Sequence, residues 1–244
     1  MSATAIIQAR LDSTRLPRKV LLPLGGKPMI QQIIESLQHQ KEITQIVLAT
    51  SNDNSNDELS VIAKKTGIQY FEGSRENVLS RFYHVVEKFG GDYIIRVTGD
   101  NPFTSGSLAA LAYNKAKKNN ADLSSISGIP LGTAVEIIKA DALSRCFHEA
   151  QTNYQKEHVT PYIKENPDKF SIIRYDSTIE NPFHDLRLTV DTPEDYELAE
   201  TIYKNIYKGY PLELPEVLTF IKDNLDLIKI NSHIEQRPMT HAEK

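Results

Sequence analysis

The feature that most constrains the fold is a repeated alternation of short apolar runs and amphipathic segments through the first half of the chain. The apolar runs are rich in β-branched residues and predict strands at residues 3–9, 45–50, 68–71 and 92–98. The segments between them have apolar residues at helical spacing and predict helices at residues 28–38, 56–65, 76–88 and 105–118. This alternation favours a doubly wound α/β fold, with a mostly parallel sheet and helices on both faces.

The second half of the chain is less regular. Its apolar runs predict strands at residues 122–126, 134–139, 170–175 and 186–190, and helices near residues 140–150, 157–166 and 193–208. Glycine and proline at residues 127–133 predict a mobile loop. We expect one domain at residues 1–233, within which about residues 128–184 form an inserted lobe for acceptor or dimer contacts, and a flexible tail at residues 234–244.

The composition limits the kinds of partner and the cellular compartment that we expect for this chain. A formal net charge of −4 gives no reason to expect nucleic acid. The single cysteine, Cys146, excludes an intramolecular disulfide and fits a reducing compartment, and its apolar neighbours indicate core packing. There is no secretory signal pattern and no apolar run of roughly 20 residues, so we expect a soluble cytoplasmic protein without a membrane partner.

The loop after the first predicted strand carries four positive charges, on Arg10, Arg15, Arg18 and Lys19. Ligands of open α/β sheets bind beyond the carboxyl ends of the strands, where this loop lies. Four cations repel one another unless an anion sits among them, and a polyphosphate fits that role. The alternative is a solvated surface loop. Neither GxxxxGK[ST] nor GxGxxG occurs, which disfavours a P-loop or a dinucleotide site.

Two aspartates follow predicted strands in the same way. Asp100 lies in VTGDNP and Asp191 in RLTVDTP, so each follows an apolar run and precedes a proline. Magnesium is usually held by one or two carboxylates, with phosphate and water oxygens completing its coordination. The alternative is that each aspartate is only a turn or helix-cap residue, although Thr192 can cap the helix at Pro193 instead.

The segment IIQARLDSTRLPRKVLLPLGGKPMI, at residues 6–30, resembles the opening of the cytidylyltransferase superfamily, which includes the synthetases of CMP-Kdo and CMP-sialic acid. It is most similar to the spore coat polysaccharide biosynthesis branch, and the resemblance extends from about residue 3 to 205. That branch usually has Met-Gly where this chain has Leu11-Asp12, and glycine where it has Arg18.

The resemblance implies a Rossmann-like nucleotidyltransferase fold and a homodimer. It also implies a cytidylyltransferase that moves CMP from CTP to an acidic, nonulosonic-acid-like sugar and releases pyrophosphate, for surface polysaccharide or glycan biosynthesis. Mg²⁺ would be held by Asp100 and Asp191, and the catalytic residues would be Arg10, Lys19 and Asp100. The expected nucleotide-binding residues are Gln8, Ala9, Arg10, Ser13, Arg15, Lys19, Arg75, Arg81 and Asp100.

Two further segments match the family pattern. In GSRENVLSRF, residues 73–82, we expect Ser74 to cap a helix and Arg75 and Arg81 to lie near the nucleotide, or else to be exposed helical arginines. On the acceptor side we expect Glu136, His158 and Arg187. A packed or capping histidine at 158 and a solvent-facing carboxylate at 136 are the alternatives.

Three other functions remain open from the sequence. The first is the same fold acting with another nucleoside triphosphate and a sugar phosphate. The second is a glycosyltransferase, but its usual Asp-x-Asp pair would need an acid at 102, which is Pro102. The third is a non-catalytic nucleotide-binding or scaffold protein, for which Asp12 and Arg18 are the best support.

Overall fold

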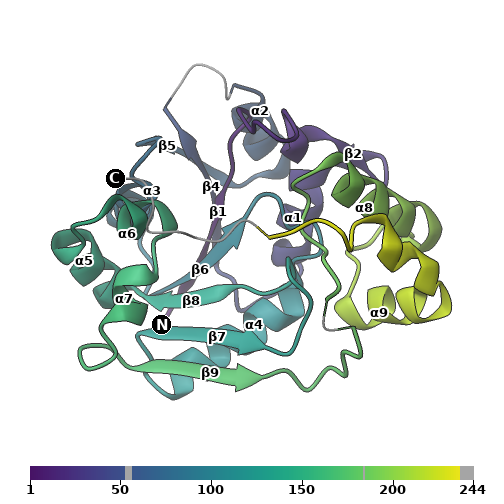
Figure 1. The fold of residues 1–244 in the computed structure, drawn as a ribbon. Helices are drawn as coiled ribbons and strands as arrows, with labels where there is room; N and C mark the ends of the chain where they lie inside the picture. The colour runs from purple at the N-terminus through teal and green to yellow at the C-terminus, as the bar shows by residue number, and fades with distance from the viewer. Residues whose placement is uncertain (53–56, 184, 237–244) are drawn as a thin grey trace.

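A seven-stranded sheet forms the centre of the molecule (Figure 1). The computed structural model describes residues 1–52, 57–183 and 185–236. The strand order is β5-β4-β1-β6-β8-β7-β9. Neighbouring strands are parallel except around β8, which runs antiparallel to β6 and β7. The strands of this sheet are β1 (Ala3–Gln8), β4 (Gln45–Ser51), β5 (Gln69–Gly73), β6 (Tyr93–Thr98), β7 (Leu123–Ser127), β8 (Glu136–Lys139) and β9 (Ile172–Asp176). The predicted mostly parallel sheet is confirmed.

Helices cover both faces of the sheet, as a doubly wound fold requires. Strand β1 shows why: Ala5 and Ile7 point into one buried cluster, and Ile6 between them points into the other. The first cluster takes its helical residues from α1 (Met29–Gln38), α2 (Asp57–Thr66), α4 (Gly106–Lys118), α8 (Pro193–Ile206) and α9 (Leu214–Asp223). On the second face lie α3 (Val78–Phe89), α5 (Ala140–Glu149), α6 (Asn153–His158) and α7 (Pro161–Glu165). Cys146 is fully buried in the second cluster, as predicted.

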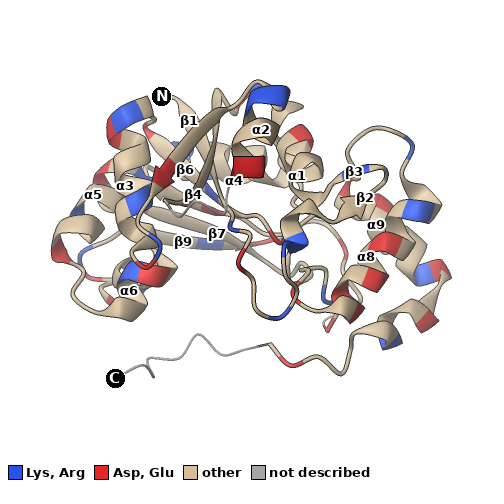
Figure 2. Cartoon of the chain, turned by 90° about the horizontal axis from the view of Figure 1, so that it is seen from above, with Lys and Arg blue, Asp and Glu red and all other residues tan. Residues whose placement is uncertain are grey.

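Short elements complete the chain. The 3₁₀ helix η1 (Lys19–Leu21) follows the basic loop, and η2 (Leu225–Ile230) follows α9. A two-stranded ribbon, β2 (Pro23–Leu24) with β3 (Lys27–Pro28), precedes α1. None of the helices in the described ranges is long and apolar enough to traverse a lipid bilayer. Basic and acidic residues both occur along α8 and α9 (Figure 2).

The single helix predicted at residues 157–166 is wrong, because two short helices, α6 and α7, occupy this region. The break falls at Val159, whose φ of 71° is left-handed, and Thr160. Pro161 explains the break: inside a continuous helix it would have no N–H to donate, and its ring would clash with the carbonyl of the preceding turn. Pro161 instead begins α7, where a missing N–H costs nothing.

The strand predicted at residues 186–190 is also wrong. Its one ladder contact is an isolated bridge between Leu131 and Arg187, and the Leu188 N–H donates to the Leu131 carbonyl at 2.8 Å. The run is apolar because Leu188 and Val190 are buried, not because it belongs to the sheet. The Val190 N–H then donates to the Asp100 carbonyl at 2.8 Å. The segment therefore still delivers residue 191 to the turn that carries Asp100.

Residues 128–184 contribute β8 and β9 to the same sheet and α5, α6 and α7 to one face. Their expected part in acceptor and dimer contacts stays a prediction. Of the expected tail, residues 237–244 lie outside the described residues. Gln236, within the described part, accepts a hydrogen bond from Arg187.

Candidate active site

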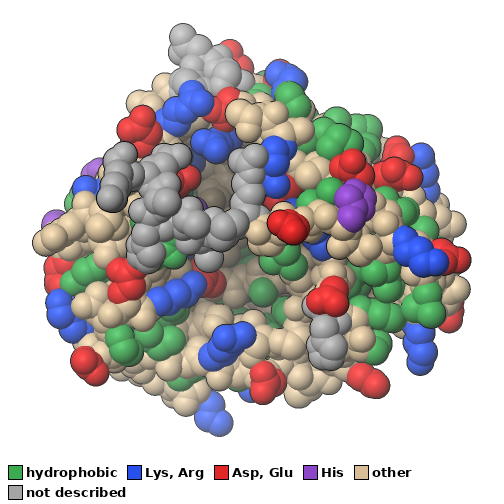
Figure 3. Space-filling view, in the orientation of Figure 1, with side chains coloured by type: hydrophobic (Ala, Val, Ile, Leu, Met, Phe, Trp, Pro, Cys, Tyr) green, Lys and Arg blue, Asp and Glu red, His purple; other side chains and the backbone are tan. Residues whose placement is uncertain are grey.

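A cleft of about 800 Å³ opens beyond the carboxyl ends of β1, β5 and β6. Figure 3 shows the hollow on this face, with Lys and Arg side chains at its rim. Its walls are the basic loop, the turn after β6, the segment between β5 and α3, and helix α6. It brings together most of the predicted site, namely Gln8, Ala9, Arg10, Ser13, Arg15, Lys19, Arg75, Arg81, Asp100, His158 and Asp191.

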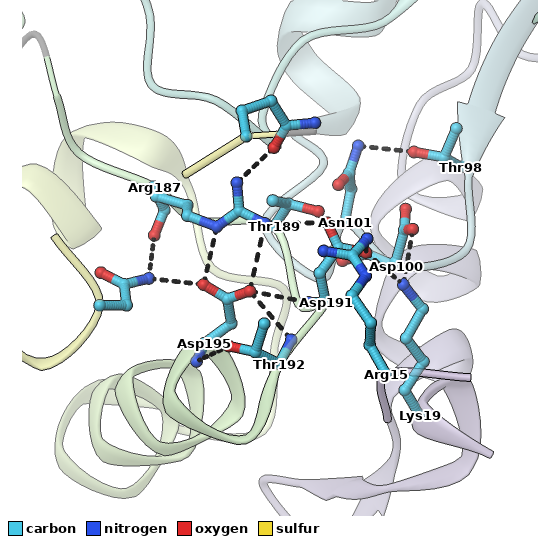
Figure 4. Close-up of polar contacts among 12 residues, drawn as sticks. Arg15, Lys19, Thr98, Asp100, Asn101, Arg187, Thr189, Asp191, Thr192 and Asp195 are labelled. Atoms are coloured by element: carbon cyan, nitrogen blue, oxygen red, sulfur yellow. Dashed lines mark hydrogen bonds and ion pairs between the residues drawn. The ribbon is translucent and has the colours of Figure 1, made fainter. Parts of the chain in front are cut away.

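The two predicted metal ligands meet at one ammonium group (Figure 4). Lys19 Nζ lies 2.8 Å from Asp100 Oδ2 and 2.7 Å from Asp191 Oδ1. An Arg15 guanidinium nitrogen lies 2.9 Å from the same Asp191 oxygen. Burial opposes ionisation of Asp191, but Lys19, Arg15 and Arg187 outweigh it and hold its pKa below the ordinary value. Two carboxylates this close would repel one another without these cations.

Lys19 reaches this position because the loop turns sharply one residue earlier. Arg18 has φ 59° and ψ 22°, a left-handed conformation that glycine adopts without steric cost. This conformation accounts for the glycine that the spore coat polysaccharide biosynthesis branch usually has at the position of Arg18. The Arg18 side chain turns away from the cleft to pair with Glu58 on α2.

We expect Arg18→Gly to leave stability within about 1 kcal/mol of wild type, because relief of the left-handed strain offsets a lost surface ion pair of similar size. Arg18→Ala is the matched control: it also removes the ion pair but keeps a Cβ, so it should be less stable than the glycine variant by about 1 kcal/mol. Urea unfolding of both variants measures the difference. Equal stability of the two would contradict strain at this position.

Asp12, the other departure from the similar branch, lies between two arginines of the cleft. Its carboxylate is 3.3 Å from Arg10 Nε and pairs with the Arg75 guanidinium. The Asp12–Arg75 pair joins the basic loop to the segment after β5. The negative charge of Asp12 is therefore balanced locally by two cations that we predict to bind nucleotide phosphates.

The segment between β5 and α3 corrects one sequence prediction. Asn77, not Ser74, caps α3, because its side chain accepts from the Ser80 N–H at 2.8 Å. Ser74 instead accepts from the Asn77 N–H at 3.0 Å. Arg81 is buried and donates to the Ser74 carbonyl at 2.8 Å, so it supports this wall of the cleft from behind. Arg75 is the more exposed of the two predicted arginines.

The three predicted acceptor residues lie in different surroundings. Among them only His158 lines the cleft; burial, together with Arg96 and Lys164, lowers its pKa and favours neutral imidazole. Glu136 lies 2.8 Å from an Arg96 nitrogen and 2.6 Å from Lys164 Nζ. Arg187 lies behind Asp191 and is buried. Contact of these residues with an acceptor stays a prediction.

Some cleft residues were not predicted from the sequence. Asn153 and Lys156 line the cleft from α6, one helical turn apart. A signal for them exists, because Thr152 and Gln155 form a capping box that fixes where α6 begins. Thr98 also lines the cleft at the end of β6. Gln8 Oε1, another group at the cleft, is buried and has no hydrogen-bond partner among the described residues.

The carboxylate pair fits a divalent metal. Both groups converge on one positive charge inside a cleft that is lined by further cations. Within the described ranges no group of three or more His, Cys, Asp and Glu side chains could enclose a metal ion. A pair of carboxylates is what magnesium takes from a protein when substrate phosphates supply other ligands. The α/β fold, the basic loop and this pair together define a nucleotidyltransferase.

Comparison with known proteins narrows that class. A model of the cytidylyltransferase family matches residues 4–213, so the chain belongs to this family. Spore coat polysaccharide biosynthesis protein SpsF of Bacillus subtilis is 35% identical over 228 residues, which are 91% of this chain and 94% of that protein. A 3-deoxy-manno-octulosonate cytidylyltransferase of Geobacter sulfurreducens is 31% identical over 48% of each chain.

A solved cytidylyltransferase from Leptospira borgpetersenii superposes with a TM-score of 0.88 at 28% identity, covering 97% of this chain and 100% of that one. The predicted family, fold and enzyme class are therefore confirmed. Cytidylyltransferases generally use a divalent metal, which agrees with the fit of the carboxylate pair.

Proposed function

We propose that this enzyme transfers CMP from CTP to an acidic, nonulosonic-acid-like sugar and releases pyrophosphate, for surface polysaccharide or glycan biosynthesis. The observation that carries the proposal is the convergence of Asp100 and Asp191 on Lys19 in a cleft lined by Arg10 and Arg15. We place the enzyme in the cytoplasm as a homodimer.

The basic loop would hold the triphosphate. Arg10, Arg15 and Lys19 line one side of the cleft, and Arg75 lines the other. Guanidinium groups bind phosphate oxygens through paired N–H donors, and an ammonium group acts as a point charge. The Gln8 side-chain oxygen, which has no hydrogen-bond partner among the described residues, fits an N–H donor of the nucleotide, because a buried polar atom without a partner costs free energy.

Mg²⁺ would be held by Asp100 and Asp191 and would supply charge stabilisation to the α-phosphate when bound. For this to happen, Lys19 has to leave the two carboxylates. Its ammonium group is then available to the phosphates. Lys19 thus neutralises the aspartates in the free enzyme and the triphosphate in the complex.

In the reaction, the acceptor hydroxyl oxygen forms a bond to the α-phosphorus, the bond from that phosphorus to the bridging oxygen breaks, and pyrophosphate leaves. The hydroxyl proton passes to solvent. Positioning and charge stabilisation supply most of the acceleration in such transfers. Arg10 and Lys19 would stabilise the charge that develops on the leaving pyrophosphate.

Positive groups on the acceptor side support an acidic sugar. Lys156 lines this side of the cleft beside the Glu157 carboxylate and the neutral imidazole of His158, and Arg96 and Lys164 lie around the carboxylate of Glu136. Arg96 and Lys164 leave one positive charge in excess there. The family relative named for 3-deoxy-manno-octulosonate, an acidic sugar, agrees with this assignment.

A pyrophosphate-release assay tests the proposal. Each of CTP, UTP, GTP and ATP is combined with Mg²⁺ and with a panel of nonulosonic acids and neutral sugar phosphates. We expect release with CTP and an acidic sugar only. Release with another nucleotide and a sugar phosphate would replace the proposal with that activity, and no release with any pair would favour a nucleotide-binding protein.

A further inference from the structure

The metal carboxylate Asp191 is held from behind by a buried polar network. One of its oxygens faces Lys19, and the other accepts from an Arg187 guanidinium nitrogen at 2.9 Å. Arg187 Nε donates to Asp195 Oδ1 at 2.8 Å. The exposed fractions of Arg187 and Asp195 are 4% and 2%. Asp191 therefore has one oxygen available to the cleft and one fixed by the protein interior.

Asp195 holds the Arg187 side chain and also the main chain at residues 191 and 192. Its Oδ2 accepts from the N–H groups of Asp191 at 2.9 Å and Thr192 at 3.1 Å (Figure 4). The Thr192 side chain in turn caps α8 by accepting from the Asp195 N–H, the capping role that the sequence predicts for it. Asp195 thus holds both the main chain of Asp191 and the arginine that orients its carboxylate.

The last member of the network comes from the C-terminal segment. Asn231, with 1% of its surface exposed, follows η2 and lies beyond residue 213, where the match to the family model ends. Its Nδ2 donates to Asp195 Oδ1 at 2.9 Å and to the Arg187 carbonyl at 3.0 Å. Gln236 accepts from the other Arg187 guanidinium nitrogen.

We propose that Asn231, through Asp195 and Arg187, is a positioning residue for Asp191, so that the C-terminal segment sets how tightly the active site binds metal. The inference rests on the proposed function, because it takes Asp191 as a metal ligand. The Asn231 amide donates one N–H to the Arg187 main-chain carbonyl and the other to the Asp195 carboxylate, so it holds both partners of the Arg187–Asp195 ion pair. Residues that bond to a metal ligand from behind hold that ligand in its binding orientation.

The test compares two titrations of the full chain by calorimetry, one with Mn²⁺·CTP and one with CTP in EDTA. We expect Asn231→Ala to weaken Mn²⁺·CTP binding by about 10-fold and to leave metal-free CTP binding unchanged. A residue with only a structural role would move both affinities together or neither. Asn224→Ala is the matched control, since Asn224 is exposed in the same segment and its side chain bonds only to the Phe220 carbonyl among the contacts described.

Two further measurements separate the outcomes. If Asp191→Asn binds Mn²⁺·CTP as wild type does, the metal assignment of the proposed function fails. If Asp191→Asn is weakened and Asn231→Ala is not, only the role of Asn231 is overturned. Asn231→Leu, which nearly preserves the side-chain volume, has no donors and adds no charge, should show the same selective loss of Mn²⁺·CTP binding as Asn231→Ala, and wild-type Mn²⁺·CTP binding by it would overturn the role of the two donors.

Wild-type protein provides a measurement that needs no variant. Hydrogen exchange of the peptide covering residues 225–236 should slow on addition of Mn²⁺·CTP, because fixing Asp191 also fixes the network behind it. The peptide of the edge strand β9 is the reference that should not change. Unchanged exchange at residues 225–236 would overturn the coupling.

Discussion

Asp100→Asn should lower the rate of CTP-dependent pyrophosphate release by about 10²- to 10³-fold while the chain remains folded. A metal that stabilises transition-state charge is worth several kcal/mol, and each 1.36 kcal/mol corresponds to about tenfold in rate. Asparagine keeps the shape of the side chain but removes its charge, and Asp100 lies at the cleft rather than in the core. The measurement is steady-state pyrophosphate release with Mg²⁺, alongside a thermal melt.

Asp226→Asn is the control for that experiment, because Asp226 is an exposed carboxylate that pairs with Lys229 and does not line the cleft. It should match wild type in both assays. Near wild-type release by the Asp100 variant, with CTP and the correct sugar, would contradict the assignment of Asp100 as a metal ligand.

Lys19→Met should destabilise the metal-free protein by about 3–5 kcal/mol and weaken CTP binding. The variant leaves Asp100 and Asp191 facing one another without the ammonium group between them, and removal of one partner from a buried ionic cluster has an effect of this size. Divalent metal then replaces the lost charge. Mg²⁺ alone should therefore raise the melting temperature of the variant more than that of wild type.

The pH dependence of stability gives the Lys19 prediction a second measurement. The pKa of Asp191 is held below its ordinary value, so its contribution to stability is present at neutral pH and is lost as the pH falls through the folded-state value. Lys19→Met removes a main cause of the lowered pKa. Between about pH 5 and pH 3 the wild type should lose more stability than the variant. Parallel stability curves, or an equal response to Mg²⁺, would contradict the role of Lys19 as an internal counter-ion.

The sheet and one half of the site follow from local pattern. Strand β1 and strand β6 are short β-branched runs, and parallel strands end at one edge, so the approach of Lys19 to Asp100 could be predicted. Asp191 reaches the same place even though its predicted strand does not form. The similarity between VTGDNP and RLTVDTP therefore predicted that Asp100 and Asp191 lie together, but it did not predict whether residues 186–190 pair as a strand of the sheet.

The supporting network could not be predicted, for a physical reason. Asn231 contacts Arg187 across 44 residues, and a single buried amide leaves no periodic signal in the sequence. The cap of α3 shows the same limit at short range, since Ser74 and Asn77 are both good capping residues and only the backbone decides which one accepts. Polar contacts are set by geometry to within an ångström, whereas periodicity reports only which face of an element is buried.

The close approach of the loop at residues 127–133 to the Asp191 segment constrains how this enzyme can diversify. Gly132 has φ 92°, and a methyl group there would lie 2.7 Å from the Leu188 carbonyl carbon. Any larger residue would therefore displace the main chain that leads to Asp191, so position 132 of this loop is not free to vary with the acceptor. Helix α6 has no such attachment to Asp100 and Asp191 among the contacts described, and it presents Lys156 and His158 to the cleft. Changes of sugar preference among related enzymes should accordingly accumulate on α6, while Gly132 stays glycine.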